Sequence, residues 1–181
     1  MQGAIFTAFS DLVIEQQGMG AWDEILDNVQ PASGGIYTRG QQYDDNELFA
    51  LVGALAEKTG LPATDLVRAF GKFLFGKLYS NMPPNIEHIS DLKEFLISID
   101  SVIHVEVQRI HPDAYLPKFE YTETPEGDLV MYYASKRKLC HAAEGLILGA
   151  AEQFQRKVTI SHPECMHQGD ERCKLIISIE D

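Results

Sequence analysis

The hydrophobic pattern of the sequence changes near Pro117, and this change limits the folds that the chain can adopt. Before it, apolar residues recur at the spacing of amphipathic helices. After it, residues 117–123 and 128–134 have the character of strands on either side of a turn at 125–128. The pattern predicts an α+β fold, in which a helical N-terminal part precedes a four-stranded antiparallel sheet that a long helix crosses. The remaining elements of the sheet part are a helix at about 137–155 and strands at 158–161 and 174–179.

The helical part contains several runs with this spacing, and each run has residues that can cap or stop it. The length of 181 residues suits one domain, with a helical part at about 1–110 and a sheet part at about 111–181. The helices are expected at residues 2–17, before Pro31, between Asp44 or Asp45 and Gly60, after Pro62, and after a cap at Ser90 or Asp91.

Charge and hydropathy limit the partners of the chain. It carries 15 basic and 27 acidic residues, a net charge of −12, which disfavours nucleic acid and anionic membranes and favours a basic patch on another protein. The first residues lack the features of a signal peptide, and no stretch approaches the roughly 20 apolar residues of a membrane span. We therefore expect a cytoplasmic protein that binds neither nucleic acid nor membranes.

A run of hydrogen-bond donors follows the predicted turn. In an extended chain Tyr133, Ser135 and Arg137 share one face, where they present two hydroxyls and a guanidinium. These groups suit a ligand with two neighbouring carboxylates, because arginine binds a carboxylate with two parallel hydrogen bonds. Haem is such a ligand and also needs a neutral imidazole on its iron, which His104 can supply. Whether the helix continues past His104 stays open in the pattern, because residues 105–108 alternate like a strand.

The chain resembles a known family at these residues. A histidine after an apolar helix, followed about thirty residues later by Tyr-x-Ser-x-Arg, is typical of the haem-nitric oxide/oxygen binding (H-NOX) domains, which are similar to the haem domain of soluble guanylate cyclase. The resemblance runs from Met1 to the last strand. It implies that haem b lies between the helical part and the sheet part and that His104 is the proximal iron ligand. It also implies that Tyr133, Ser135 and Arg137 hold the propionates, and that the histidine lies on a helix.

The resemblance also implies which side chains contact the porphyrin. Pro117 matches a proline that presses on the ring, although a proline that simply starts a strand would look the same. Ile5 matches a distal residue that packs against the ring, and Phe9 lies one helical turn further along. As plain core residues these two would look no different.

The distal side of the haem decides which gas binds. Family members that hold oxygen place a tyrosine five residues after the arginine of the motif, and here that position is Ala142. Bound oxygen gains from a hydrogen-bond donor, whereas nitric oxide binds ferrous iron tightly without one. The resemblance therefore implies a sensor that binds nitric oxide and excludes oxygen, with carbon monoxide as a second candidate ligand. Tyr79 or His141 could supply a donor instead. The assisting distal positions are apolar: Phe9, Leu74 and Leu146.

Signalling is expected to pass through His104. Nitric oxide weakens the iron bond to the ligand opposite it, so the bond to His104 would lengthen or break and free its helix to move. The sequence contains no recognisable kinase, cyclase or phosphodiesterase segment, so we expect no enzymatic activity of its own. The family implies a separate partner enzyme, either a histidine kinase or a cyclic-di-GMP enzyme.

A second constellation lies in the C-terminal quarter, which holds all three cysteines. Cysteine thiolates and an imidazole are the ligands of a closed zinc site, and the same set occurs in a zinc-binding bacterial subset of the family. His167 or His141 could replace His162, and the cysteines could instead be buried free thiols. The candidate ligands are Cys140, His162, Cys165 and Cys173.

Two other functions remain open from the sequence. One is a zinc or thiol redox sensor, because oxidation of the thiolates would eject the metal. The other is a haem-free small-molecule binding domain of the 4-vinyl reductase type. Its C-terminal pattern is similar, but such domains lack the paired histidine and Tyr-x-Ser-x-Arg. That pattern comprises Gly145, Gly149, Glu164, Cys165, Gly169 and Cys173.

Overall fold

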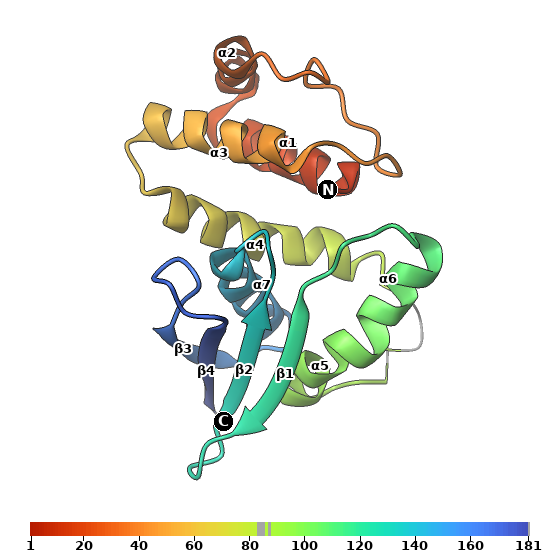
Figure 1. Cartoon of the computed structure of the whole chain (residues 1–181), viewed down its shortest axis with the longest axis vertical. Helices are drawn as coiled ribbons and strands as arrows, with labels where there is room; N and C mark the ends of the chain where they lie inside the picture. The colour runs from red at the N-terminus through yellow and green to blue at the C-terminus, as the bar shows by residue number, and fades with distance from the viewer. Residues whose placement is uncertain (83–85, 87, 181) are drawn as a thin grey trace.

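A computed structural model describes residues 1–82, 86 and 88–180 (Figure 1). Helices make up the first part, and strands with one long helix make up the second, as the sequence predicts. None of the helices in these ranges combines the length and hydropathy needed to cross a bilayer. The helices are α1 (Gly3–Gln17), α2 (Met19–Val29), α3 (Asp45–Thr59), α4 (Ala63–Tyr79), α5 (Leu92–Ser98), the π-helical segment η2 (Ile99–Ile103), α6 (His104–Ile110) and α7 (Cys140–Gln153).

The sheet has four antiparallel strands in the order β1-β2-β4-β3, which confirms the predicted architecture. Helix α7 lies behind the strands in Figure 1 and packs on them through apolar side chains shared in one cluster. The central strands β2 and β4 are the most buried, because both of their edges are paired. The strands are β1 (Lys118–Glu123), β2 (Leu129–Ala134), β3 (Lys157–Glu164) and β4 (Cys173–Glu180).

The buried apolar side chains form two clusters, and the division between them falls inside α4. The upper cluster joins α1 to α4 and ends at Leu74, whereas the lower cluster begins at Phe75 and joins α5, α7 and the sheet. Leu146 of α7 contacts both clusters. The residues predicted to surround haem are therefore distributed over both sides of this division.

Helices α4 and α7 approach each other so closely that glycine is required at their contact. A Cβ atom built on Gly145 would lie 2.0 Å from the carbonyl oxygen of Arg68, and one built on Gly71 would lie 2.2 Å from that of Ala142. Both contacts are with backbone, so neither can be relieved by a rotamer change. The two helices that carry Leu74 and Ala142 are thus held at a fixed distance.

Replacing Gly145 with alanine is expected to destabilise the protein by about 2–3 kcal/mol, because the two helices must separate. Thermal unfolding should show a midpoint lower by roughly 5–10 °C. Gly76→Ala in α4 is the matched control, since a Cβ there meets nothing within 4 Å. It should raise stability by about 0.5–1 kcal/mol through helix propensity. Equal effects of the two substitutions would contradict this account of the helix contact.

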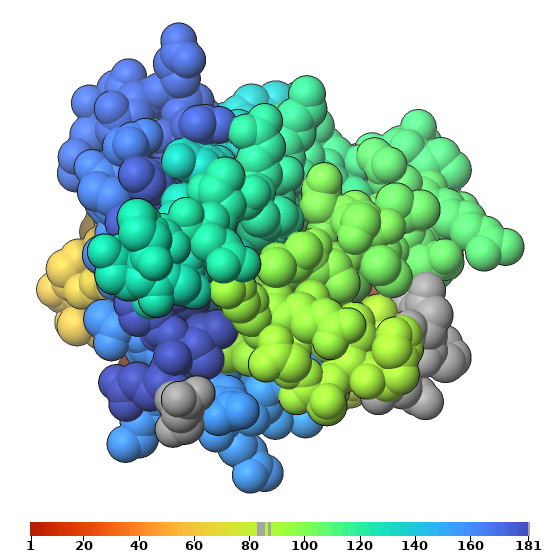
Figure 2. Space-filling model, turned by 90° about the horizontal axis from the view of Figure 1, so that it is seen from below, coloured from red at the N-terminus to blue at the C-terminus, as the bar shows by residue number. Residues whose placement is uncertain are grey.

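The helix that carries His104 continues past it to Ile110, so the helical interpretation of residues 105–108 is correct. Helix α5, η2 and α6 follow one another without a break, and the wider π-helical turn lies immediately before His104. Such turns are common at functional sites in helices. Figure 2 shows this helix at the molecular surface beside the strands, and Val105 and Ile110 are 54% and 70% exposed.

Candidate functional site

His104 lies where the helix faces the sheet. Its side chain is 15% exposed, and its ring stacks on Phe119 of β1 with centroids 5.5 Å apart. Burial lowers the pKa of His104, although Asp100 opposes this shift, so the neutral imidazole that binds iron is favoured. Nδ1 lies 3.1 Å from Oδ1 of Asp100. Because a carboxylate only accepts hydrogen bonds, Nδ1 carries the hydrogen and Nε2 is left for a metal.

The structure brings Tyr133, Ser135 and Arg137 together, but not as one extended row. Strand β2 ends at Ala134, and the Ser135 hydroxyl accepts a hydrogen bond from the Arg137 amide at 3.2 Å. This side-chain turn competes with strand pairing, which explains why the extended alternation stops there. The Tyr133 hydroxyl accepts a hydrogen bond from the Leu139 amide at 2.9 Å.

Arg137 already binds a carboxylate of this chain, which the sequence did not reveal. Its Nε and Nη2 atoms lie 2.6 and 3.0 Å from the two oxygens of Asp45, and the ammonium group of Met1 lies 2.7 Å from Oδ1. Burial raises the pKa of Asp45, but the hydrogen bonds from Arg137 and Met1 outweigh it, and the net shift is downward. Asp45 starts α3, and the sequence indicates only a helix cap there, because no sequence pattern relates it to a residue 92 positions away.

These three side chains retain donors for a second carboxylate ligand. In the described contacts Arg137 uses Nε, Nη2 and one Nη1 hydrogen, the last toward the carbonyl of Tyr115 at 2.7 Å. Two of its five N–H groups therefore remain. The hydroxyls of Tyr133 and Ser135 act as acceptors in the contacts above, so each can still donate. The donor set fits haem propionates, and His104 fits the iron.

Asp45→Asn is expected to lower stability by about 1–2 kcal/mol, because the partly buried Arg137 and Met1 lose an anionic partner. The folded pKa of Asp45 is lowered, so this stabilisation is complete above the unfolded value of about 4 and is lost as pH falls through the folded value. Urea unfolding at neutral and acidic pH should show the difference shrinking in acid. Glu120→Gln, which removes the exposed pair with Arg172, should change stability by less than about 0.5 kcal/mol.

The apolar positions predicted to face the porphyrin lie mostly in the upper cluster. Phe9 is fully buried, with its ring edge-on to Phe70 at 5.3 Å, and Leu74 is buried beside it. Ile5 and Leu146 are partly buried against the same cluster. The remaining two positions are also half-buried, namely Ala142 in α7 and Pro117 just before β1.

The two polar side chains considered as alternative distal donors point elsewhere. Tyr79 packs in the lower cluster, where its ring stacks on Phe75 at 5.4 Å. His141 stacks on His167 at 5.8 Å, beside the cysteines. Tyr79 is not among the apolar side chains of the upper cluster that holds Phe9 and Leu74.

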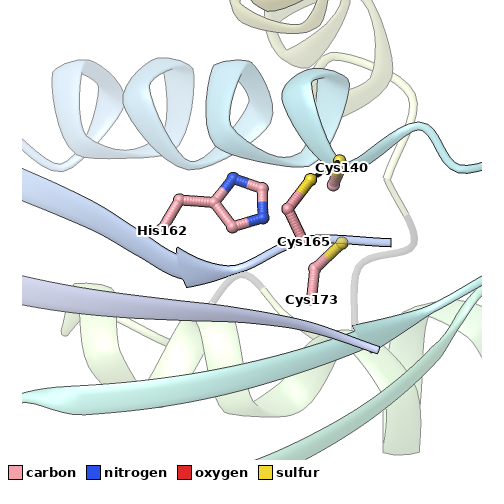
Figure 3. A group of neighbouring side chains, drawn as sticks. All are labelled: Cys140, His162, Cys165 and Cys173. Carbon is pink, nitrogen blue, oxygen red and sulfur yellow. Dashed lines mark hydrogen bonds between the residues drawn. The ribbon is translucent and has the colours of Figure 1, made fainter. Parts of the chain in front are cut away.

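The three cysteines and His162 meet between α7, the end of β3 and the start of β4 (Figure 3). Their ligand atoms all lie within 4.8 Å of one another, and the cysteines are buried free thiols. The Sγ atoms of Cys140 and Cys165 are 3.8 Å apart. Two thiolates bound to one tetrahedral zinc ion are expected to have a sulfur-to-sulfur distance of about 3.8 Å. Burial raises the pKa of the Cys140 thiol, and the neighbouring Cys173 and Cys165 raise it further.

The surroundings of the His162 imidazole show whether these four side chains fit a metal. The pairing of β3 with β4 shifts its register between Ser161 and Glu164, the stretch that contains His162. Its Nε2 atom is buried and has no hydrogen-bond partner among the described residues, and in Figure 3 it faces the thiols. A buried imidazole nitrogen without a partner is costly unless a metal takes its lone pair. The donor set therefore fits zinc.

The other histidines near the cysteines are less suited to this role. Nε2 of His167 lies 2.7 Å from the carbonyl oxygen of Lys138, so this nitrogen already has a partner. His141 and His167 form a second group with Cys140, and His141 also belongs to a third group with Glu144 and His162. Glu144, which no sequence pattern marks as part of this site, is buried among these rings and contacts both His141 and His162.

Comparisons with known proteins agree on one family. The model of the haem-NO-binding family matches residues 2–162. The chain is 37% identical to an H-NOX protein from Shewanella oneidensis solved in the Fe(II)NO state, with a TM-score of 0.93 and complete coverage of both chains. An unliganded Fe(II) H-NOX protein from K. algicida is 32% identical over 100% of this chain and 97% of that one, with a TM-score of 0.91.

Guanylate cyclases are also similar. The soluble guanylate cyclase gcy-32 of Caenorhabditis elegans is 27% identical over 172 residues, and gcy-35 is 26% identical over 168 residues. These matches cover 88% and 87% of this chain but only 24% and 23% of the cyclases, so the chain spans about a quarter of the length of these relatives. H-NOX domains bind haem and act as gas sensors rather than catalysts. The chain belongs to the haem-NO-binding, or H-NOX, family.

Proposed function

We propose that residues 1–181 form a single haem-binding domain that senses nitric oxide at ferrous haem and regulates a separate signalling enzyme. The observation that carries the proposal is His104, whose neutral imidazole is anchored through Nδ1 to Asp100 and leaves Nε2 for the iron. Tyr133, Ser135 and Arg137 would hold the propionates. A histidine kinase or a cyclic-di-GMP enzyme is the proposed partner. The free cysteines suit a cytoplasmic location, because thiols stay reduced there.

The chain's own residues supply the switch. Haem held by His104 would supply a ferrous iron that binds nitric oxide and then holds the histidine less tightly. Release of His104 would free α6, whose outward face carries the exposed Val105 and Ile110. The π-helical turn before His104 departs from the regular α-helical hydrogen bonding, as turns at functional sites in helices often do. A ligand that favours one of two helix positions in this way shifts the equilibrium between two conformations of the domain, and the partner enzyme responds to that shift.

Selectivity follows from the apolar side chains at the positions proposed to face the distal side of the haem. Ala142 occupies the position where oxygen-binding relatives carry a tyrosine, and Phe9, Leu74 and Leu146 are apolar. Pro117 and Ile5 would pack against the ring. The alternative donors Tyr79 and His141 have other surroundings, as described above. Such a pocket gives nitric oxide the advantage over oxygen.

Ala142→Tyr tests the selectivity. A hydroxyl that donates to bound oxygen should contribute about 1.5–3 kcal/mol and slow oxygen dissociation by roughly 10–100-fold. The absorption spectrum of the reduced variant should therefore respond to air, whereas the wild-type spectrum should not. Ala142→Phe is the matched control, because it adds the ring without the hydroxyl. The absorption spectrum of this reduced variant should not respond to air. A response of Ala142→Phe equal to that of the tyrosine variant would contradict the role of the hydroxyl.

We also propose that zinc binds Cys140, His162, Cys165 and Cys173, as in the zinc-binding bacterial members of the family. The close approach of the thiols and the unpartnered Nε2 of His162 support this assignment. A second candidate function, redox sensing, rests on the same residues, because oxidation of the thiolates would release the metal. It predicts that peroxide lowers the zinc content and changes the activity of the partner enzyme. Unchanged zinc and activity after peroxide would exclude it.

A further inference from the structure

The side of His162 that faces away from the cysteines is held by a carboxylate. Oε1 of Glu144, in α7, lies 2.5 Å from Nδ1 of His162. Glu144 is only 4% exposed, so water does not compete for this hydrogen bond. In Figure 3 Nδ1 points toward α7 while Nε2 points toward the thiols.

This contact selects the tautomer of His162. A carboxylate can only accept, so Nδ1 must carry the hydrogen and Nε2 must present its lone pair to the three sulfur atoms. We propose that Glu144 is a positioning residue for the zinc site: it holds His162 in the ring orientation and tautomer that bind the metal. The inference rests on the zinc site proposed above and extends it to a residue that does not itself bind zinc.

Glu144 is itself fixed from a second helix. Its Oε2 atom accepts a hydrogen bond from Nε of Arg68 in α4 at 2.6 Å, and Arg68 is held in turn by Asp65 at 3.0 Å. Arg68 therefore fixes the carboxylate that fixes His162. The chain of contacts runs from α4 through α7 to β3, across the helix pair that is closely packed at Gly145.

The same contacts argue against Glu144 as a metal ligand. Glu144, His141 and His162 are close enough to form a group of potential ligands. However, a cation bound to this carboxylate would face the guanidinium of Arg68, whose Nε already occupies Oε2. His162 can offer Nε2 to the cysteines only while Nδ1 stays on Glu144. The metal is thus expected at Nε2 of His162, on the side of the ring that faces the cysteines.

Zinc competition with a chromophoric chelator, using the full chain under reducing conditions, tests the proposal. Glu144→Ala should weaken zinc binding by about 10–100-fold, and Glu144→Gln, which keeps an acceptor, should recover part of the loss. Glu152→Gln is the matched control, because Glu152 also lies in α7 and pairs with α4, through Lys72 at 2.5 Å, but makes no hydrogen bond to His162. It should bind zinc like the wild type.

A double substitution separates positioning from a general effect on the fold. If Glu144 acts through His162, Glu144→Ala should cost no further affinity in a His162→Ala background. Cobalt substituted for zinc should give Glu144→Ala and His162→Ala the same change in absorption, that of a site losing its nitrogen ligand. The inference is overturned if Glu144→Ala binds zinc like the wild type or weakens binding equally in both backgrounds. If the wild type binds no zinc, the proposed zinc site is wrong, and so is the positioning role of Glu144.

Discussion

His104→Gly should lose haem, with an affinity at least about 100-fold lower than that of the wild type, which corresponds to about 2.7 kcal/mol. The reason is that the imidazole is the ligand assigned to the iron, while the rest of the pocket offers apolar contact and propionate donors. Free imidazole added to the variant should enter the space left by the side chain and restore the absorption band. Because this added imidazole has no covalent link to α6, the variant should bind nitric oxide without passing a signal to the partner enzyme.

His111→Gly provides the control for this experiment, since His111 follows the same helix at its C-terminal end. It should retain haem like the wild type. The amount of haem bound per chain after gel filtration is the measurement. Equal haem content in the His104 and His111 variants would show that another residue binds the iron.

Removal of zinc should produce the largest change in stability. A metal bound at a free concentration 100–1,000 times its dissociation constant contributes about 3–4 kcal/mol to the folded state. Stripping it with a chelator under reducing conditions should lower the thermal midpoint by roughly 10 °C. The physical cause is that α7, β3 and β4 would lose the metal proposed to join them, and three buried thiols would be left together.

Two histidine variants show whether the ligand is assigned correctly. His162→Ala should lose most of this stabilisation, whereas His167→Ala should keep it, because Nε2 of His167 is bonded to the carbonyl of Lys138. Metal analysis by mass spectrometry, alongside the melting curves, gives the zinc content of each variant. Zinc retained by the His162 variant but lost from the His167 variant would reverse the assignment.

The architecture could be predicted from the sequence because it depends on local patterns. Helical spacing located α1 to α5, and alternation around the turn before β2 located the hairpin. The cap of α3 was narrowed to two residues, and Asp44 proved to be the one that accepts a hydrogen bond from the helix, at 2.9 Å from the Asn46 amide. Each of these features is decided within a few residues of chain.

The contacts around the site depend on long-range geometry, which the sequence does not display. Asp45 meets Arg137 across 92 positions, and Glu144 meets Arg68 across 76. The prediction that Tyr133, Ser135 and Arg137 lie along one extended strand was wrong, because a hydrogen bond from the Arg137 amide to the Ser135 hydroxyl forms a turn there. Candidate ligands could thus be named from residue type and spacing, but not the carboxylates that orient them.

Absorption spectra of the reduced protein in argon, in air and with nitric oxide decide whether it is a selective nitric oxide sensor. We expect a Soret band that shifts with nitric oxide and does not respond to air. If air also produces a stable shift, the distal side holds a donor and the selectivity argued from Ala142 is wrong. If no Soret band forms even after haem is supplied, His104 does not bind haem and the proposed sensor function is contradicted.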